Sequence, residues 1–417
     1  MGASMSVQRC GMLASAGLWA AIMAGCNQAV SACTEPGRVR ISPDDISMIL
    51  GTSFVASAES FACGNAVPLG ERLTWRSLNP TIADVDAVTG LVTGKAVGPT
   101  AIIAAGERSG DLGRVRVFVY NPTNPTDAEA RAELRYYIEQ VIRATARTYS
   151  VHDDAGHTMD GLKVIASAAA GGFIGVYQTY RAGTFDAHLA TSTDLLNWHW
   201  RVTLARQAAQ PTIKAAGNGY VVALETDGDN HLRFAYYDSW TALLAANPSK
   251  TYDAPRTLSP CAEGTPNIYE GDDSRVDVGF HYWSECNVGR QARGVTDWTS
   301  WSATTDVALD TAITTYGIAG VGDRDVLTFR GYQFGVIEGE GVRNDWTSWR
   351  IFLYDYQTRT ADQLNILTDG GSISFGNPTV EQIELGGQPA LVMSLYLFLD
   401  GARGGETGSL VYYRTYP

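Results

Sequence analysis

The segment QPTIK at residues 210–214 returns in altered form as TPNIY at 265–269 and as NPTVE at 377–381. The first two prolines are 55 residues apart, and the second and third are 112 apart, which is two periods of 56. This spacing predicts a further unit beginning near residue 322 and a first unit near residue 156. About five units of this length fit into the C-terminal part of the chain.

Tryptophan corners recur in the same part of the sequence. DWTSW occurs identically at 297–301 and 345–349, and apolar segments typical of strands, such as GYVVALE and HLRFAYY, lie between such corners. A unit of about 45 to 56 residues with four strands is the size of a propeller blade, so we predict a five-bladed β-propeller over residues 151–417. The repeated tryptophans that we expect to pack within and between blades are Trp198, Trp298 and Trp346.

The N-terminal part shows short alternating strands separated by turns, with Trp75, Val92 and Val117 on the apolar side. Its run TWRSLNPTIADVDAVTGLVTGKAVGPTAIIA at 74–104 resembles the group 2 bacterial immunoglobulin-like (Ig-like) domain, in its Trp-x-Ser-x-Asn-Pro, its Val-Asp and its Gly-x-Val-Thr-Gly. The resemblance implies a β-sandwich over residues 37–120 that acts as a spacer or adhesion module.

A linker and a helix are expected between these domains, at residues 121–150. NPTNP at 121–125 is the linker, and TDAE at 126–129 is a capping-box pattern that predicts one amphipathic helix of about 20 residues. The expected fold class is therefore all-β, an Ig-like β-sandwich plus a five-bladed β-propeller joined by one short helix.

The composition restricts the partners. The chain has 417 residues and a formal net charge of −13, which argues against nucleic acid and anionic membrane surfaces and is compatible with neutral or basic ligands. The first 33 residues read as an export signal, with Arg9 before an apolar run. The run ends in IMAGC, which resembles a bacterial lipobox with Cys26 as the lipidated residue; the alternative is ordinary signal cleavage after Ala32. We expect a cell-envelope lipoprotein or a secreted protein, touching the membrane only through this anchor.

Four cysteines remain after the export segment, Cys33, Cys63, Cys261 and Cys286. An even number in an oxidising compartment predicts two disulfides, and the division into domains favours 33 with 63 and 261 with 286 among three possible connectivities. No Cys-x-x-Cys pair or histidine cluster indicates a zinc site, and the sequence identifies no cofactor.

In a propeller the first residues of the inner strands meet around one end of the central axis. Two carboxylates facing each other there are the minimum for glycoside hydrolysis, and we expect Asp160 to be the base or nucleophile and Glu263 the general acid. For substrate binding we expect Tyr177, Trp283, His281 and Gln210, with Tyr180 and Trp240 as further sugar platforms. The polar residues at the expected strand starts are Asp160, Gln210, Glu263, Asp323 with Asp325, and Asn377.

Two short motifs strengthen this expectation. ATSTDLLNW at 190–198 resembles a corner of the five-bladed propeller glycosidases of the arabinanase/xylosidase and invertase types. EGTPNI at 263–268 resembles the Glu-Gly-Pro strand that carries the general acid in the arabinanase/xylosidase type. The chain departs from both patterns, because Gln210 stands where a middle Asp is expected and Thr265 interrupts Glu-Gly-Pro. The resemblance implies a monomeric protein that acts on a polysaccharide or oligosaccharide; the competing interpretations are a noncatalytic glycan-binding or adhesion protein and a scaffold of the cell envelope.

Overall fold

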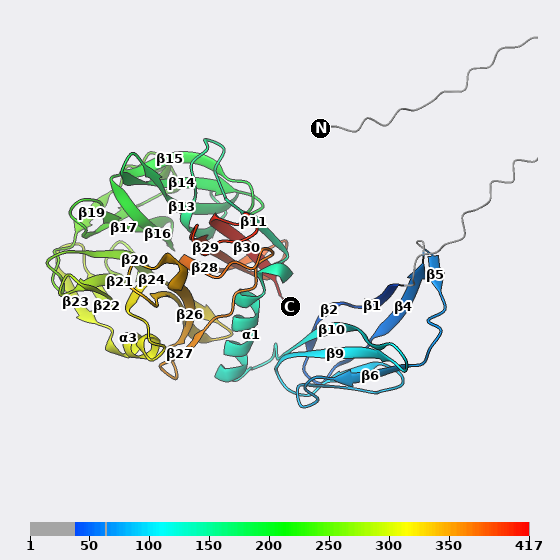
Figure 1. Ribbon diagram of the computed structural model, residues 1–417. Helices are drawn as coiled ribbons and strands as arrows, with labels where there is room; N and C mark the ends of the chain where they lie inside the picture. Colours follow the sequence, from blue (N-terminus) through cyan, green and yellow to red (C-terminus); the bar gives the residue numbers. More distant parts are fainter. Residues whose placement is uncertain (1–37, 63–64, 417) are drawn as a thin grey trace, which may run out of the picture.

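The computed structural model describes residues 38–62 and 65–416, which form two β domains with a helix between them (Figure 1). No helix in this part of the chain is long and apolar enough to cross a membrane. Three predictions fall outside the described residues, namely the export segment at 1–33, the lipidation of Cys26 and the disulfide between Cys33 and Cys63.

The N-terminal domain is a β-sandwich. Alternate residues of its strands point into one core, where Trp75, Val92 and Val117 are buried. Strand β10 pairs in parallel with β2 and antiparallel with β9. The three sheets are β1 (Arg38–Ser42), β4 (Ser57–Ala62) and β5 (Asn65–Val67); β2 (Asp45–Ile49), β10 (Gly110–Tyr120), β9 (Gly98–Gly106) and β6 (Leu73–Ser77); and β3 (Ser53–Val55), β8 (Leu91–Gly94) and β7 (Ala83–Val85).

Helix α1 (Asp127–Glu139) begins with the expected capping box. The Thr126 hydroxyl accepts from the Glu129 backbone N–H, and the Glu129 carboxylate accepts from the Thr126 N–H at 2.8 Å. The helix is shorter than predicted, because the chain passes through a 3-10 turn, η1 (Val141–Arg143), into strand β11 (Ala146–Tyr149). Pairing of β11 with the last strand of the chain stabilises the extended conformation of this segment.

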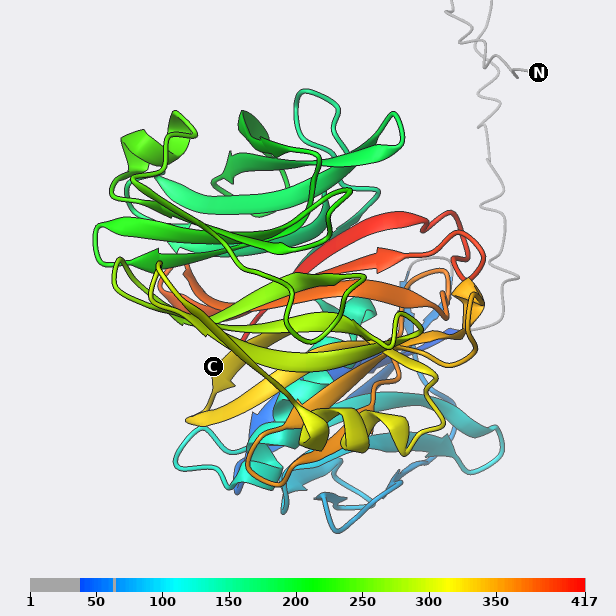
Figure 2. The same cartoon turned by 90° about the vertical axis from the view of Figure 1, so that its left-hand side faces the viewer.

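Helix α1 joins the two domains through one apolar core. Its Leu134, Tyr137 and Ile138 are buried in a cluster that also contains Phe118 of the sandwich and side chains of the last two blades. The rings of Phe118 and Tyr136 stack with centroids 4.1 Å apart. Figures 1 and 2 show the blue and cyan strands of the sandwich beside the propeller, with α1 at the junction.

The C-terminal domain is a propeller of five four-stranded antiparallel sheets, which confirms the predicted fold class. Short helices α2 (Trp240–Leu244) and α3 (Val307–Thr314) lie in connections. From the inner strand outward, the blades are β12 (Asp160–Ser167), β13 (Gly172–Arg181), β14 (Thr184–Ser192), β15 (His199–Arg206); β16 (Ala208–Ala216), β17 (Gly219–Thr226), β18 (Leu232–Tyr237), β19 (Lys250–Asp253); β20 (Glu263–Gly271), β21 (Val276–Ser284), β22 (Val288–Thr296), β23 (Trp301–Thr305); β24 (Gly320–Phe329), β25 (Tyr332–Glu340), β26 (Trp349–Asp355), β27 (Thr360–Gln363); and β28 (Phe375–Leu385), β29 (Gln388–Leu397), β30 (Gly408–Thr415), β11.

The propeller is closed by pairing between its two chain ends. Strand β11 lies antiparallel to β30 and is the outermost strand of the fifth blade. Residues 146–149, which we assigned to the linker and helix at 121–150, therefore belong to the propeller. This short strand pairs with β30 alone, so the sequence around it does not show that it belongs to a sheet.

All five inner strands share one irregularity near their start. The pairing register with the second strand shifts there, for example between Asp160 and Lys163 in β12 and between Gly264 and Asn267 in β20. Such a bulge re-aims the neighbouring side chains. Residues Gln210, Thr265 and Asn377 inside these bulges have φ of 50°, 47° and 46°. The repeated Pro-led segments are these bulges.

The tryptophan corners do not all have the same environment. Trp198 is buried and Trp298 packs on a core, as predicted. Trp346 is 49% exposed and outside the core, but its ring packs on Trp349 of its own blade and on Phe398 of the fifth. DWTSW at 297–301 connects the third and fourth strands of its blade, whereas the identical segment at 345–349 connects the second and third. The two segments therefore lie at opposite ends of their blades.

Candidate active site

A cavity of about 960 Å³ opens where the inner strands begin, and residues from all five blades line it. Four polar residues that the sequence places at strand starts, Asp160, Gln210, Asp323 and Asn377, meet in its wall. They come from four different blades and are separated by up to 217 positions. The bulge at the start of each inner strand turns them toward the axis.

Asp160 is held by a closed ring of amide hydrogen bonds. Gln178 Nε2 donates to Asp160 Oδ2 at 2.8 Å, and Asn377 Nδ2 donates to Oδ1 at 2.7 Å. Gln210 completes the ring, because its backbone N–H donates to Gln178 Oε1 at 2.8 Å and its Nε2 donates to Asn377 Oδ1 at 3.1 Å. The ring orients the carboxylate and stabilises its ionised form.

Glu338 on β25 is a second carboxyl held by the same asparagine. The backbone N–H of Asn377 donates to Glu338 Oε2 at 2.5 Å, while the Asn377 side chain holds Asp160. Glycines make room for it, since a Cβ at Gly322 would lie 2.4 Å from Glu338 Oε1 and one at Gly376 would lie 2.9 Å from Oε2. A buried carboxyl and a half-buried one therefore both bind Asn377.

Two further carboxyls complete the floor of the cavity. Glu225 on β17 accepts from Asn230 Nδ2 at 2.6 Å and from the Thr265 N–H at 3.2 Å. It fills the space above Gly264, where a Cβ would come within 1.8 Å of its Oε2. Asp323 on β24 is 9% exposed, and its Oδ2 is closed to solvent.

Burial and mutual repulsion change the acidity of this group. Burial raises the pKa of Glu338 to about 7, and the nearby charge of Asp160 adds to the effect. Burial, followed by the charges of Glu338, Glu225 and Asp160, raises the pKa of Asp323 well above its usual value. Burial also raises the pKa of Asp160, against the opposing effect of its hydrogen bonds. The site therefore retains protons at pH values where isolated carboxyls are ionised.

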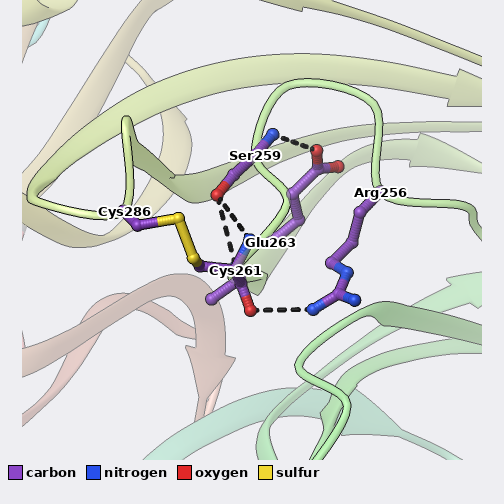
Figure 3. The surroundings of a disulfide bond; sticks show 6 residues. Arg256, Ser259, Cys261, Glu263 and Cys286 are labelled. Atoms are coloured by element: carbon purple, nitrogen blue, oxygen red, sulfur yellow. Dashed lines mark hydrogen bonds between the residues drawn. A yellow bond between two sulfur atoms is a disulfide. The ribbon is translucent and has the colours of Figure 1, made fainter.

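Glu263 is not among the residues that line the cavity. Figure 3 shows its carboxylate hydrogen-bonded at Ser259, near the disulfide. Its carboxylate accepts from the backbone N–H groups of Thr257, Leu258 and Ser259 at 2.6, 2.5 and 3.0 Å, and the side chain is buried. The predicted disulfide between Cys261 and Cys286 is present beside it. A carboxylate committed to three donors and facing away from the cavity organises the loop before β20, so the geometry does not support a role as general acid.

Replacing Glu263 with alanine is expected to lower the free energy of unfolding by about 2–4 kcal/mol, because three backbone N–H groups lose their acceptor. Urea unfolding measures this change, and Glu270→Ala, an exposed position on the same strand, is the control with an expected change within about 0.5 kcal/mol. We expect the folded Glu263→Ala variant to be as active as the wild type. A Glu263→Ala variant that is stable but inactive would show that Glu263 has a catalytic role after all.

The other predicted site residues lie on one face or the other of their strands, because side chains alternate along a strand. Tyr177 is fully buried and donates to Asp153, so it does not reach the cavity and the expected contact with substrate is not formed. Its neighbour Gln178 points to the opposite face and lines the cavity. His281 and Trp283 line the cavity from β21, and burial lowers the pKa of His281 to about 4, so its ring is neutral. Trp240 packs on Tyr220 instead, with ring centroids 6.3 Å apart.

Sequence reasoning missed Glu225 and Glu338 because both lie on second strands. The second strand of a blade reaches past the bulge, and the residue paired with the start of the inner strand faces the cavity. Gln178 pairs with Asp160, Glu225 with Ala209 and His281 with Gly264. The acidic ends of GYVVALE and FGVIEGE were the available signal. In the described residues no group of three or more His, Cys, Asp or Glu is arranged to hold a metal ion.

The sequence model of the bacterial Ig-like domain (group 2) family matches residues 38–112, so the N-terminal domain is of that class. No curated protein matches the sequence. Similar solved structures include a thermostable family-43 glycoside hydrolase, with a TM-score of 0.42 and 13% identity over 64% of this chain and 92% of that chain. A Bombyx mori GH32 β-fructofuranosidase has a TM-score of 0.42 and 14% identity, covering 70% and 68%. A Podospora anserina α-L-arabinofuranosidase in complex with cellotriose has a TM-score of 0.41 and 10% identity, covering 65% and 96%.

Proposed function

We propose that this protein is an exported, carbohydrate-active glycoside hydrolase that uses Asp160 and Glu338 as its pair of carboxyls. The observation that carries the proposal is the double contact of Asn377, whose side chain holds Asp160 while its backbone N–H holds Glu338. Glycosidases need two carboxyls about 5 to 9.5 Å apart, one protonated and one ionised. Two carboxyls that bind the same asparagine are close enough for that arrangement.

The two environments suit different roles. Burial raises the pKa of Asp160, but the two side-chain amides that donate to it oppose this rise, which suits a base or nucleophile. Glu338, with a pKa raised by burial to about 7, keeps its proton near neutral pH and suits the general acid that protonates the leaving oxygen. Glu338 thus takes the role that the sequence suggested for Glu263.

Aromatic side chains at the rim offer faces for sugar rings. Trp346 and Trp349 stack with centroids 5.8 Å apart, and Phe398 lies 4.9 Å from Trp346. All three line the cavity, as do Tyr180 and Trp283. Exposed aromatic faces beside buried polar groups suit a ligand that is apolar on its ring faces and polar at its edges, which describes a saccharide.

Export rests on the N-terminal segment and on the disulfide. The bond between Cys261 and Cys286 supports an oxidising compartment, and the Ig-like domain supports a place at or outside the cell envelope. Lipidation at Cys26 would leave the propeller anchored by the N-terminus, with the sandwich and α1 between anchor and cavity. We expect the protein to act as a monomer.

The proposal is tested by incubating the full-length protein with arabinans, xylans and fructans and measuring released sugar. We expect kcat/KM to fall as pH rises through about 7, because Glu338 must be protonated. We expect Glu338→Gln to lose most activity. A wild type that retains glycan on an affinity gel but releases no sugar would identify a noncatalytic glycan-binding protein instead.

The same raised pKa predicts a dependence of stability on pH. Folded Glu338 binds a proton more tightly than the unfolded chain, so its contribution to stability is present at low pH and is lost as pH rises from about 4.5 to 7. Each unit of pKa difference corresponds to about 1.4 kcal/mol. Urea unfolding across this range should show a shallower decline for Glu338→Gln than for the wild type, and parallel declines would contradict the assignment.

A further inference from the structure

Three aromatic side chains on one side of the cavity, Trp346, Trp349 and Phe398, form a continuous surface that we call the aromatic platform. The rings of Trp346 and Trp349 stack with centroids 5.8 Å apart and planes 13° apart. The ring of Phe398 lies 4.9 Å from the first and 5.6 Å from the second. All three line the cavity, and Trp346 is 49% exposed. An exposed ring that continues a cavity wall is a surface on which a ligand can stack.

The outer end of the platform is held in place before any ligand arrives. Trp346 begins the 3-10 turn η2 (Trp346–Ser348), and the Asp345 carboxylate accepts from the Thr347 N–H at 2.9 Å and from its hydroxyl at 2.7 Å. The carbonyl of Trp346 accepts from the hydroxyl of Ser374, the residue before β28 in the next blade. Two blades therefore fix the turn, which lowers the entropy cost of stacking a ligand on it.

The platform leads outward from Glu338. A Cβ at Gly376 would lie 2.5 Å from Phe398 Cζ and 2.9 Å from Glu338 Oε2, so the ring edge and the carboxyl border the same small space. Trp349 pairs with the residue two positions after Glu338, which is about 7 Å further along β25. Trp346 lies beyond it, in the connection that follows β25. The three rings thus run from the proposed general acid to the rim of the cavity.

We infer that the aromatic platform binds the sugar units on the leaving-group side of the cleaved bond, and that the substrate is a saccharide chain with at least two units on that side. The inference rests on the proposed function, in which Glu338 is the general acid. A general acid protonates the oxygen of the leaving group, so the units that leave lie on its side of the bond. Phe398 then faces the first of these units and Trp346 the second. The side chains that contact Asp160 are amides instead, which suit the hydroxyl groups of the unit on the other side.

The dependence of hydrolysis on chain length tests the inference with the full-length protein. The substrates are the disaccharide and the tetrasaccharide of whichever glycan the wild type cleaves best among arabinan, xylan and fructan. We expect kcat/KM of the wild type to be at least about 10-fold higher for the tetrasaccharide. Trp346→Ala should lower the tetrasaccharide value by about 10-fold and change the disaccharide value less than about 2-fold. Trp200→Ala, an exposed tryptophan outside the cavity lining, is the matched control and should change both values less than about 2-fold.

The products report the side of the bond on which the chain extends. In glycoside hydrolysis the leaving group carries the reducing end, so the tetrasaccharide is labelled there with a heavy oxygen isotope and its fragments are analysed by mass spectrometry. We expect the wild type to place the label mainly in fragments of two or more units. Trp346→Ala should shift the label toward the monosaccharide.

Label found only in the monosaccharide would overturn the inference and leave the hydrolase standing, as would an equal loss on both substrates in folded Trp346→Ala. If that variant does not fold, the labelled products of the wild type decide. If no glycan is cleaved, the hydrolase is removed, and calorimetric titration with the three tetrasaccharides tests the platform alone. Binding that Trp346→Ala weakens by about 10-fold would support the platform as the surface for the outer sugar units, and binding that it leaves unchanged would remove the platform as well.

Discussion

Asp160→Asn is expected to lower kcat/KM by about 10²–10⁴-fold while leaving the protein folded. Asparagine has the same shape and keeps one of the two acceptor oxygens that Gln178 and Asn377 use, but it cannot act as a base or nucleophile. Initial rates of sugar release on the best substrate of the panel measure the loss. The circular dichroism spectrum of the variant should match that of the wild type, which shows that the loss of activity is not a loss of fold.

Comparison with Glu338→Gln shows whether the two carboxyls act as a pair. Residues that serve one chemical step are strongly non-additive, so the double variant should be no more than about 10-fold slower than the slower single variant. Full additivity would indicate separate roles. Substantial activity in folded Asp160→Asn would exclude it as the catalytic carboxylate.

Lys163→Met is expected to be the most destabilising single substitution in the propeller, at about 3–5 kcal/mol. Lys163 on β12 contacts Asp325 at 2.7 Å, Glu381 at 2.9 Å and the Val380 carbonyl at 2.7 Å, so it connects the first blade to the fourth and fifth. Methionine fills the space but leaves the buried carboxylate of Asp325 without its cation. The free energy of urea unfolding measures the effect.

Two variants control this prediction. Arg206→Met breaks the pair of Arg206 with Asp186, where the arginine side chain is 73% exposed, and should cost about 0–1 kcal/mol. Adding Asp325→Asn to Lys163→Met should recover part of the loss, because the uncompensated charge is removed. A small effect of Lys163→Met alone would mean that water reaches and solvates Asp325.

Much of the fold could be predicted because it depends on repeated local chemistry. Pro211, Pro266 and Pro378 occupy the same bulge in three inner strands, and the repeat therefore revealed the number of blades. The strand β11 could not be predicted in this way, because its pairing with β30 joins segments that are 261 positions apart at the pair of Tyr149 and Leu410. The exposure of Trp346 could not be predicted, because identical pentapeptides occupy opposite ends of two blades.

The candidate site was predictable only in part. Asp160 and Gln210 stand at strand starts, which the repeat identifies, and the structure places both in the cavity. Glu225 and Glu338 reach the same floor from second strands, where their facing depends on pairing register. Glu263 shares the position of a strand start, but the loop at 257–259 offers three N–H donors that draw its carboxylate away.

The sequence by itself determined the all-β class, the five-unit repeat, the Ig-like domain and the disulfide between Cys261 and Cys286, because turn chemistry, alternation and cysteine number act locally or repeat along the chain. Only the tertiary structure decided which carboxyls meet. Whether a side chain faces the axis depends on a one-residue bulge and on the donors that neighbouring loops present, and both are set by segments distant in sequence.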